Sequence, residues 1–393
     1  MTKGLLTLNA GSSSLKVGLF LSDGETSLAN GLVDRIGPDA VLRLKDAKGG
    51  AIPATGAVTS HFDAIATVVA ALSERWPDLE LVAIGHRIVH GGPERSRPVI
   101  LNDETLTDLA ALSPLAPLHQ PHNLAGVRAA MAAFPGVPQI GCFDTAFHRH
   151  HPWVNDTFGL PRFFYEQGVR RYGFHGLSYE YIAGELRRTS PHLVAGKVIV
   201  AHLGNGASMC ALHNGQSIAS TMGFSALDGL PMGTRCGQLD PGVLLYLMDQ
   251  KGMTASAISD LLYKQSGLLG LSGLSNDMRT LEAAGTPKAA EAIDYFVFRC
   301  QREVGALAAA LGGLNALVFS GGIGENSRLI RSRICETMKW MGIEIDPARN
   351  AANERLISFD IAPTSVLVIP TNEEVVIARA AQAIICTNGR TGA

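Results

Sequence analysis

Residues 5–21 read LLTLNAGSSSLKVGLFL, two apolar runs separated by a short polar stretch. Runs of Leu, Val and Phe bounded by Gly and Ser are typical of a β-hairpin, so we predict two strands joined by a turn at Gly11–Ser14. Residues 197–212, KVIVAHLGNGASMCAL, repeat this arrangement with a turn at Gly204–Gly206. Two strand–turn–strand units, each opening a segment of mixed strands and helices, predict a duplicated α/β architecture.

The remaining segments alternate between strand and helix patterns, and two domains are expected from a length of 393 residues. The predicted helices cover residues 63–75, 103–112, 125–133, 287–311, 327–341 and 374–385, and the predicted strands cover 81–84, 138–143, 316–320 and 366–370. The clearest helix is 287–311, where Thr286 can cap the N-terminus, Pro287 suits the first position and Gly312 can end the helix. An irregular stretch over 148–171 marks the expected domain boundary.

Charge and hydropathy exclude several classes of protein. The formal net charge is −2 and no basic stripe is present, so nucleic acid is not an expected partner. The longest apolar stretch, near residues 64–72, is far shorter than the ~20 residues of a membrane-spanning helix, and the N-terminus does not resemble a secretory signal. Six cysteines without a C-x-x-C pair fit free thiols in a reducing cytosol. We therefore expect a cytoplasmic protein that does not bind membranes.

Three segments of the first half carry residues suited to binding an anion. In Asn9–Lys16, NAGSSSLK, small residues and hydroxyls let backbone N–H groups approach a phosphate, and Lys16 adds a positive charge; the alternative is an ordinary serine-rich turn. Arg87 follows a buried strand and suits a carboxylate or phosphate; the alternative is a structural ion pair. Asp144 also follows a strand, and it can orient a cationic side chain or cap a helix at Thr145.

The segments beyond residue 170 repeat this pattern of glycines beside polar side chains. His175 lies in RYGFHG, residues 171–176, although a lone histidine is more often structural than functional. The turn His202–Gly206, HLGNG, can present backbone donors to a phosphate or can be a simple hairpin turn. Arg235 lies in GLPMGTRCG, residues 229–237, and suits stabilisation of charge in a phosphoryl-transfer transition state.

Two turns near the C-terminus complete the set. Gly321–Asn326, GGIGEN, follows a strand, and its glycines would admit a nucleotide against the backbone; the alternative is a tight turn whose final Asn caps the next helix. In TNEE, residues 371–374, Thr371 and Glu374 have capping-box spacing, which leaves Glu373 to reach a hydrated Mg²⁺. Glycine-rich turns at strand ends and two isolated arginines, without a redox or zinc signature, together predict an ATP-dependent phosphotransferase that lacks a P-loop.

Eight ordered motifs are similar to those of the acetate kinase family. They are NAGSSSLK, GHRIVHGG, DTAFH, RYGFHG, HLGNG, MGTR, GGIGEN and TNEE, and the match runs from Asn9 to about Arg379. The resemblance implies the α/β fold of the actin/Hsp70/sugar-kinase superfamily, with two duplicated ribonuclease H-like (actin-like ATPase) domains and an interdomain active-site cleft. It also implies a homodimer that transfers phosphoryl groups reversibly between ATP and acetate, giving ADP and acetyl phosphate, with Mg²⁺ or alternatively Mn²⁺.

The resemblance also divides the chain by function. Residues 1–150, joined by a C-terminal helix over about 374–393, would bind the acyl group and phosphate. Residues 151–373 would bind the nucleotide and form the dimer. These functional assignments follow from the family and not from the local patterns.

By motif, the resemblance implies a role for each matching residue. Arg87 would hold the acetate carboxylate, while Arg235 and His175 would stabilise the transferring phosphoryl group. Asp144 matches the catalytic carboxylate of the family; because a carboxylate acceptor is already a nucleophile, we expect Asp144 to position a cation and not to act as a base. The expected metal ligands are Asn9 and Glu373, and the expected nucleotide and phosphate contacts are Ser12, Ser14, Lys16, His202, Leu203, Gly204, Asn205, Gly206, Asp277, Met278, Arg279, Gly322, Ile323, Gly324, Glu325 and Asn326.

An apolar pocket for the acetate methyl group is implied at Val89, Leu118 and Phe174. Ala226 stands where members of the family often have Pro, and its smaller side chain would widen this pocket and admit propionate. Three alternatives stay open: a propionate or butyrate kinase, which differs in the acyl pocket; a sugar kinase, which needs a true carboxylate base; and a non-catalytic ATP-binding switch. The small apolar residues beside Arg87 argue against the last two.

Overall fold

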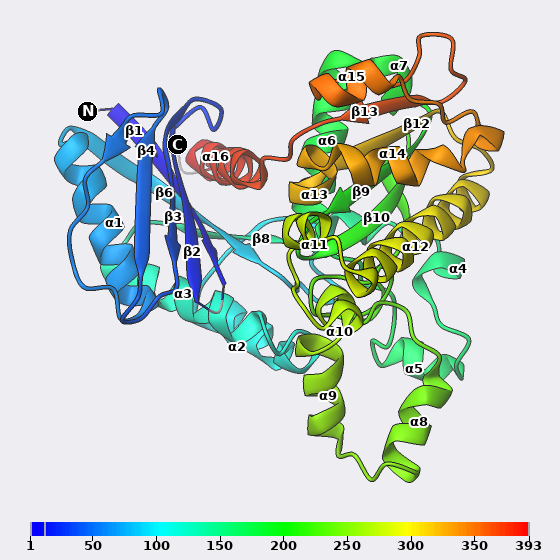
Figure 1. Cartoon of the computed structure of the whole chain (residues 1–393). Coiled ribbons are helices and arrows are strands. Elements are labelled where there is room, and N and C mark those ends of the chain that lie inside the picture. The colour runs from blue at the N-terminus through cyan, green and yellow to red at the C-terminus, as the bar shows by residue number, and fades with distance from the viewer. Residues whose placement is uncertain (1, 12, 392–393) are drawn as a thin grey trace. The chain divides into compact units, whose positions relative to one another are not determined.

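The computed structural model describes residues 2–11 and 13–391, with side chains as far as residue 387. The chain divides into two compact units (Figure 1). Unit 1 comprises Met1–Arg149 and Asn372–Ala393, and unit 2 comprises His150–Thr371. The C-terminal segment therefore returns to the unit in which the chain begins.

Unit 1 is built on one mixed sheet. Its strands are β1 (Thr2–Ala10), β2 (Ser14–Leu21), β3 (Ser27–Asp34), β4 (Val41–Asp46), β5 (Ala51–Ile52), β6 (Leu79–Ile88), β7 (Val99–Ile100) and β8 (Gln139–Phe143). They lie in the order β5–β4–β3–β2–β1–β6–β8–β7. The strands β1 to β4 form an antiparallel meander, whereas β1, β6 and β8 run parallel. The hairpin predicted from residues 5–21 is confirmed as β1 and β2.

Helices cover both faces of this sheet (Figure 1). They are α1 (His61–Arg75), α2 (Asp103–Ala111), α3 (Gln120–Ala133) and α16 (Glu373–Thr391). Leu6 and Leu8 of β1 belong to the apolar core under α1 and α3. The opposite face carries α16, and a methyl group built on Gly85 of β6 would overlap Cγ2 of Ile377. Because successive strand residues point to opposite faces, Arg87 lies on this α16 face, two residues beyond Gly85.

Unit 2 repeats the strand arrangement of unit 1. Its strands are β9 (Lys197–Leu203), β10 (Ala207–His213), β11 (Gln216–Ser220), β12 (Ala316–Ser320) and β13 (Ser365–Val368). They lie in the order β11–β10–β9–β12–β13; β9 to β11 are antiparallel, and β12 and β13 run parallel to β9. This matches the order and directions of β3–β2–β1–β6–β8, so the duplication predicted from the two hairpins is confirmed.

Helix α12 of unit 2 has the predicted bounds, Pro287–Leu311, and contacts β9, β10 and β11. Oγ1 of Thr286 accepts from the N–H of Ala289, and Gly312 ends the helix with a φ of 67°. The other helices of unit 2 are α4 (Trp153–Asp156), α5 (Arg162–Glu166), α6 (Gly176–Thr189), α7 (Pro191–Val194), α8 (Pro241–Asp249), α9 (Ala255–Lys264), α10 (Gly267–Ser272), α11 (Met278–Ala284), α13 (Gly321–Asn326), α14 (Arg328–Glu336) and α15 (Pro347–Ala352). Within residues 2–11 and 13–391, no helix has both the length and the apolar character that crossing a membrane requires.

The glycine-rich segment Gly321–Asn326 forms the helix α13 and not the turn expected from its sequence. Three glycines lower its helix propensity, but the buried guanidinium of Arg331 donates to two carbonyl oxygens of its last turn at 2.9 Å. Ser327 caps the following helix, so the predicted cap at Asn326 is wrong. The predicted helix over 327–341 is also too long, because α14 ends at Glu336.

Other boundaries shift by a few residues. Strand β6 continues to Ile88, so Arg87 lies within the strand and not beyond its end. Helix α3 begins at Gln120 and not at the predicted residue 125, because Pro121 suits the first turn of a helix. The capping box predicted for Thr371 and Glu374 at the start of α16 is wrong. Instead, Oδ1 of Asn372 accepts a hydrogen bond from the N–H of Val375 at 3.2 Å.

Candidate active site

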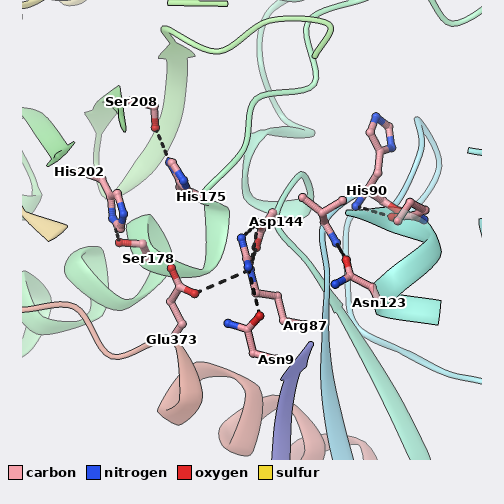
Figure 2. Close-up of polar contacts among 12 residues, drawn as sticks. Asn9, Arg87, His90, Asn123, Asp144, His175, Ser178, His202, Ser208 and Glu373 are labelled. Atoms are coloured by element: carbon pink, nitrogen blue, oxygen red, sulfur yellow. Dashed lines mark hydrogen bonds and ion pairs between the residues drawn. The ribbon is translucent and has the colours of Figure 1, made fainter. Parts of the chain in front are cut away.

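A polar cluster lies at the carboxyl ends of the parallel strands of unit 1 (Figure 2). Asn9 lies near the end of β1, Arg87 lies near the end of β6, and Asp144 directly follows β8. Glu373 is the first residue of α16, the helix that covers this face of the sheet. Parallel strands present their carboxyl ends at one edge, which is where α/β sheets bind ligands. The sequence predictions at Asn9, Arg87, Asp144 and Glu373 thus converge in one place.

Arg87 and Asp144 form an ion pair with two contact points. Nε of Arg87 donates to Oδ1 and Oδ2 of Asp144 at 3.0 and 3.1 Å, and Nη2 donates to Oδ2 at 2.5 Å. The Asp144 side chain is 1% exposed, whereas 20% of the Arg87 side chain stays accessible. The carboxylate therefore supports the guanidinium from the protein interior. The alternative of a helix cap at Asp144 is wrong, because the short 3-10 turn that follows has no side-chain cap.

The charges around Arg87 fix its protonation state. Burial lowers the pKa of Arg87, but the negative charges of Asp144 and Glu373 outweigh this effect and raise that pKa above its ordinary value. Burial raises the pKa of the Asp144 carboxyl, and the guanidinium of Arg87 opposes the rise. Arg87 is therefore a permanent cation, and its guanidinium donates to the carboxylate of Asp144.

Two further oxygen atoms lie beside the guanidinium of Arg87. Oδ1 of Asn9 accepts from Nη1 at 3.1 Å, and Oε2 of Glu373 lies 3.8 Å from Nε. An amide oxygen and a carboxylate are hard ligands, and they suit a Mg²⁺ ion that is bound mostly by phosphate oxygens and water. The donor chemistry of the two predicted metal positions therefore fits the ion. Among the described residues, no three His, Cys, Asp or Glu side chains gather as a metal-ligand set.

The backbone that follows Arg87 is held by side-chain amides of α3. The N–H of Val89 donates to Oδ1 of Asn123 at 2.9 Å, and the N–H of His90 donates to Oε1 of Gln120 at 3.2 Å. Both amide side chains are buried. Buried polar groups with satisfied hydrogen bonds rigidify their surroundings, so the segment next to Arg87 is firmly positioned.

Three of the predicted phosphate contacts, Ser12, Ser14 and Lys16, come from the first hairpin segment, where Ser14 begins β2 and Lys16 lies within that strand. Ser12 lies outside the described residues. The N–H of Gly11 donates to the carbonyl oxygen of Ser14 at 2.8 Å and closes the turn. Lys16 is exposed and is the cross-strand partner of Asn9, so the two side chains point to the same face of the sheet. A cation thus lies beside the polar cluster of unit 1.

In unit 2, the rings of His175 and His202 are stacked (Figure 2), with centroids 4.4 Å apart. His175 precedes α6 in the left-handed conformation, with a φ of 57°, and His202 lies in β9. Nδ1 of His175 is hydrogen-bonded to Oγ of Ser208, and Nδ1 of His202 is hydrogen-bonded to Oγ of Ser178, each at 2.8 Å. The orientation of both imidazoles is therefore set by serine hydroxyls.

The turn between β9 and β10 lies beside both His175 and Arg235. A methyl group built on Gly206 would lie 3.0 Å from Nη2 of Arg235 and 3.2 Å from Nε2 of His175. Arg235 is itself held in place because Nη1 donates to the carbonyl oxygen of Ala226 at 2.9 Å. The absence of a side chain at Gly206 lets a guanidinium and an imidazole approach one backbone turn, an arrangement that suits an anion.

The residues expected to contact the acyl group are divided between the units. Val89 and Leu118 belong to unit 1, where Val89 is buried and Leu118 is half-buried. Phe174 and Ala226 belong to unit 2, and both are buried. A pocket that uses all four residues stays a prediction.

A cavity of about 660 Å³ lies in unit 2. Its lining residues are Gly204, Asn205, Asn276, Asp277, Met278, Arg279, Glu282, Gly322, Ile323, Asn326 and Ser327. This volume lies within the range of small-molecule sites. Most of the nucleotide contacts expected in unit 2 line this cavity, although they come from three separate segments of the chain.

Other expected nucleotide positions do not line the cavity. Leu203 is fully buried, and Gly324 is buried within α13. Oε1 of Glu325 accepts from the backbone N–H groups of Gly321 and Thr371 at 2.9 and 3.1 Å. The carboxylate of Glu325 thus links the start of α13 to the chain beyond β13. Leu203, Gly324 and Glu325 therefore belong to the framework around the cavity.

Asn276, Glu282 and Ser327 line the cavity but were not predicted from the sequence. Oγ of Ser327 donates to Oε1 of Glu282 at 2.5 Å. Glu282 follows Met278 by four positions on α11, and residues at this spacing share a helix face. Helical spacing from the predicted Met278 is therefore the signal that indicates Glu282. Arg331, which holds the last turn of α13, gave no comparable signal.

Asp277 carries a fixed negative charge at the edge of this cavity. Its carboxylate accepts from the N–H, Nε and Nη2 of Arg279 at 2.8, 3.2 and 2.6 Å. The hydrogen bonds from the Arg279 side chain lower the pKa of Asp277 to about 2. A permanent carboxylate is only an acceptor, so it suits the hydroxyl or amino groups of a nucleotide better than its phosphates.

Comparisons with known proteins identify the family. The sequence model of the acetokinase family matches residues 4–379. The chain belongs to the acetokinase family. The acetate kinase of Methylocella silvestris is 55% identical to it, across 98% of this chain and 98% of that relative. The crystal structure of Porphyromonas gingivalis acetate kinase is 38% identical with a TM-score of 0.87, and it covers 98% of this chain and 100% of its own.

A propionate kinase shares the same architecture. The crystal structure of this enzyme from Francisella tularensis is 37% identical with a TM-score of 0.90, across 97% of this chain and 99% of its own. Membership of the acetokinase family confirms the predicted family, the fold of two duplicated domains and the enzyme class, a phosphotransferase. The acetate kinase interpretation is thereby confirmed over the sugar kinase and switch alternatives. Acetokinases use ATP, generally with a divalent metal ion.

Proposed function

We propose that this acetokinase transfers the γ-phosphoryl group of ATP reversibly to acetate, giving acetyl phosphate and ADP, and that Arg87 binds the carboxylate of acetate. The observation that carries this proposal is the ion pair with Asp144, in which a partly exposed guanidinium is supported by a buried carboxylate. A planar guanidinium held in one orientation matches a carboxylate through two parallel hydrogen bonds.

Asp144 positions Arg87 and does not act as a general base. Acetic acid, like the carboxylic acids of Asp and Glu side chains, has a pKa well below 7, so acetate is ionised and nucleophilic at neutral pH without proton removal. Both oxygens of Asp144 accept hydrogen bonds from Arg87, so the carboxylate serves to hold the guanidinium in place. Transfer is direct and in line, and catalysis comes from positioning and neutralisation of charge.

His175 and Arg235 stabilise the transferring phosphoryl group. In phosphoryl transfer, charge is spread over the equatorial oxygens of the phosphoryl group, and preorganised donors lower the barrier. The support for this role is the approach of Nε2 of His175 and Nη2 of Arg235 to the same glycine, Gly206. The nucleotide occupies the cavity of unit 2, where Asp277 accepts from its hydroxyl or amino groups.

Mg²⁺ is the proposed metal ion, with Mn²⁺ as the alternative, and Asn9 and Glu373 hold it. When bound, such an ion neutralises charge on the phosphate oxygens of ATP. Glu373 supplies a carboxylate from the first turn of α16, where the helix dipole favours a negative side chain. Asn9 supplies a neutral oxygen, and Lys16 adds a fixed positive charge on the same face of the sheet.

We also infer that the enzyme is a homodimer and that α8 forms part of its interface. All residues of α8 are described, and none is buried, although its sequence PGVLLYLMD is mostly apolar. Val243, Leu245, Tyr246 and Met248 are 39, 58, 49 and 41% exposed. An exposed helix that carries this many apolar side chains is typical of a protein–protein interface, and a second copy of the chain is the proposed occupant.

A cytoplasmic location is part of the same proposal. All six cysteines lie in the described part of the chain and are free thiols. Cysteines that stay reduced are usual in the cytosol, where thiol-based buffers prevent disulfide formation. The substrates ATP and acetate are small and polar, which suits an enzyme of that compartment.

The test is phosphoryl transfer from Mg-ATP to acetate and to propionate, with the acyl phosphate trapped as its hydroxamate. We expect turnover with acetate, and the ratio of kcat/KM for the two acids reports the effect of the small Ala226 side chain. Arg87→Ala should lower kcat/KM for acetate by about 10²–10⁴. Arg95→Ala is a matched control, because Arg95 also pairs with an aspartate of unit 1 but at the surface.

The outcome that overturns the proposal is the absence of acyl phosphate with either acid from folded protein that binds ATP. Normal turnover by Arg87→Ala would overturn the assignment of the acetate carboxylate to Arg87 while leaving the reaction itself in place.

A further inference from the structure

Two histidine–serine hydrogen bonds connect the α6 segment to the hairpin of β9 and β10 (Figure 2). His175 at the start of α6 bonds Ser208 of β10, while His202 of β9 bonds Ser178 of α6. His202 and Ser208 are direct cross-strand partners. The stacked rings of the two histidines therefore lie between two buried hydroxyls, one from the helix and one from the strand.

A third hydroxyl lies behind Ser208. The phenol oxygen of Tyr179 is hydrogen-bonded to Oγ of Ser208, and both side chains are fully buried. Burial raises the pKa of Tyr179 well above its ordinary value, so the phenol keeps its proton. The three groups form a chain from Tyr179 through Ser208 to Nδ1 of His175.

The direction of the protons along this chain decides which ring nitrogen of His175 carries its hydrogen. When the phenol donates to Oγ of Ser208, the single proton of the serine is directed at Nδ1 of His175. A neutral imidazole that accepts at Nδ1 carries its proton on Nε2. Nε2 is the nitrogen that lies beside Gly206, 3.2 Å from a methyl group built there.

We propose that Tyr179 and Ser208 are positioning residues that hold the proton of His175 on Nε2, where it is donated to a phosphoryl oxygen at the Gly204–Gly206 turn. The proposal rests on the proposed role of His175 in phosphoryl transfer. The buried hydroxyls touch neither substrate; they act through the imidazole by selecting one tautomer and one ring orientation. Without them the ring samples both tautomers, and one of these presents a lone pair to the phosphoryl oxygen instead of a donor.

The first experiment measures kcat for acetyl phosphate formation in Tyr179→Phe and Ser208→Ala. We expect each to lower kcat by about tenfold or more, the effect of removing a group that orients a functional histidine, with little change in KM for ATP. Tyr172→Phe is the matched control, because Tyr172 is also a buried phenol of unit 2 but donates to the backbone oxygen of Gly168 at 2.7 Å. Equal kcat values for Tyr179→Phe and Tyr172→Phe would overturn the proposal.

The second experiment adds the same changes to His175→Ala. Because the hydroxyls act through the imidazole, Tyr179→Phe should change kcat by less than about twofold once the ring is gone. An undiminished tenfold loss in that background would show a general structural role and would contradict the proposal. If Ser208→Ala folds poorly, the double variant of His175→Ala and Tyr179→Phe still tests the proposal, because Tyr179→Phe keeps the aromatic ring.

Nitrogen NMR of the histidine-labelled enzyme gives a readout independent of turnover. The wild type should show His175 as a single neutral tautomer with the proton on Nε2, and Tyr179→Phe should show an averaged signal. A wild-type proton on Nδ1 would overturn the proposal. Failure of the underlying function is distinguishable: if His175→Ala keeps normal kcat, the role of His175 itself is wrong, whereas a slow His175→Ala beside a normal Tyr179→Phe refutes only the hydroxyl chain.

Discussion

Nη2 of Arg87 lies 2.5 Å from Oδ2 of Asp144, and Nε donates to both oxygens of the same carboxylate. The lone pairs of Asp144 are therefore directed at a neighbouring cation. A base must direct a lone pair at the proton it removes, so this geometry favours a positioning role. The proposed reaction agrees, because its acceptor is already ionised.

Asp144→Asn should lower kcat/KM for acetate by about 10²–10³, because the amide accepts through one oxygen only and directs its NH₂ group at the guanidinium. The shape of the pH–rate profile should stay the same, since no proton transfer is lost. Asp108→Asn is the control, because Asp108 pairs with Arg95 at the surface. Loss of one limb of the pH profile in Asp144→Asn would instead identify a base.

Gly206→Ala should reduce kcat by about 10- to 100-fold, because the added methyl group lies 3.0 and 3.2 Å from the nitrogen atoms that we assign to the phosphoryl group. Gly184→Ala is the matched control within α6, where nothing lies within 4 Å of the added methyl group. That variant should keep full activity and gain about 0.5–1 kcal/mol of unfolding free energy. Kinetics and urea unfolding of both variants check the prediction, which fails if Gly206→Ala is as active as the control.

Acid should destabilise unit 1 through its buried histidines. Burial lowers the pKa of His86 to about 4 and that of His90 to about 3. Above pH ~6.5 both are neutral in the folded and unfolded states; between pH ~6.5 and ~4 only the unfolded chain binds the protons, so stability falls as the pH falls. Each histidine contributes a slope of at most about 1.4 kcal/mol per pH unit.

His86→Asn tests this pH dependence, because asparagine does not titrate. The variant should be less stable at pH 7, since it loses the hydrogen bond between His86 and Gln139, but its loss of stability between pH 7 and pH 5 should be smaller than that of the wild type. Urea unfolding at both pH values measures the difference. An unchanged pH dependence would show that His86 is protonated equally in the two states.

Leu245→Glu should separate the proposed homodimer into monomers, because a carboxylate in an apolar interface loses its hydration without gaining a partner. Leu329→Glu is the control, since Leu329 is a similarly exposed leucine on α14. Light scattering after gel filtration gives the mass of each variant. Dimers that persist in Leu245→Glu, or monomers in the wild type, would contradict the assignment of α8 to the interface.

Local signals account for the elements that the sequence predicted well. The bounds of α12 follow from a cap at Thr286, a proline at the first position and a left-handed Gly312. Both hairpins follow from apolar runs joined by small polar residues. These features depend on neighbouring residues only, because backbone dihedrals, caps and strand alternation are set within a few positions along the chain.

The sequence by itself thus determined the α/β class, the duplicated hairpins and, through eight motifs, the family, and it named the candidate residues of the site. Tertiary structure decided what those residues contact. Helix α13 forms against its glycine content because Arg331, from the next helix, binds its carbonyl oxygens. Asn9, Arg87, Asp144 and Glu373 meet only because parallel strands align their carboxyl ends and α16 returns to the same face of the sheet. Long-range packing sets such contacts, and a local pattern carries no information about a partner that lies far away in the chain.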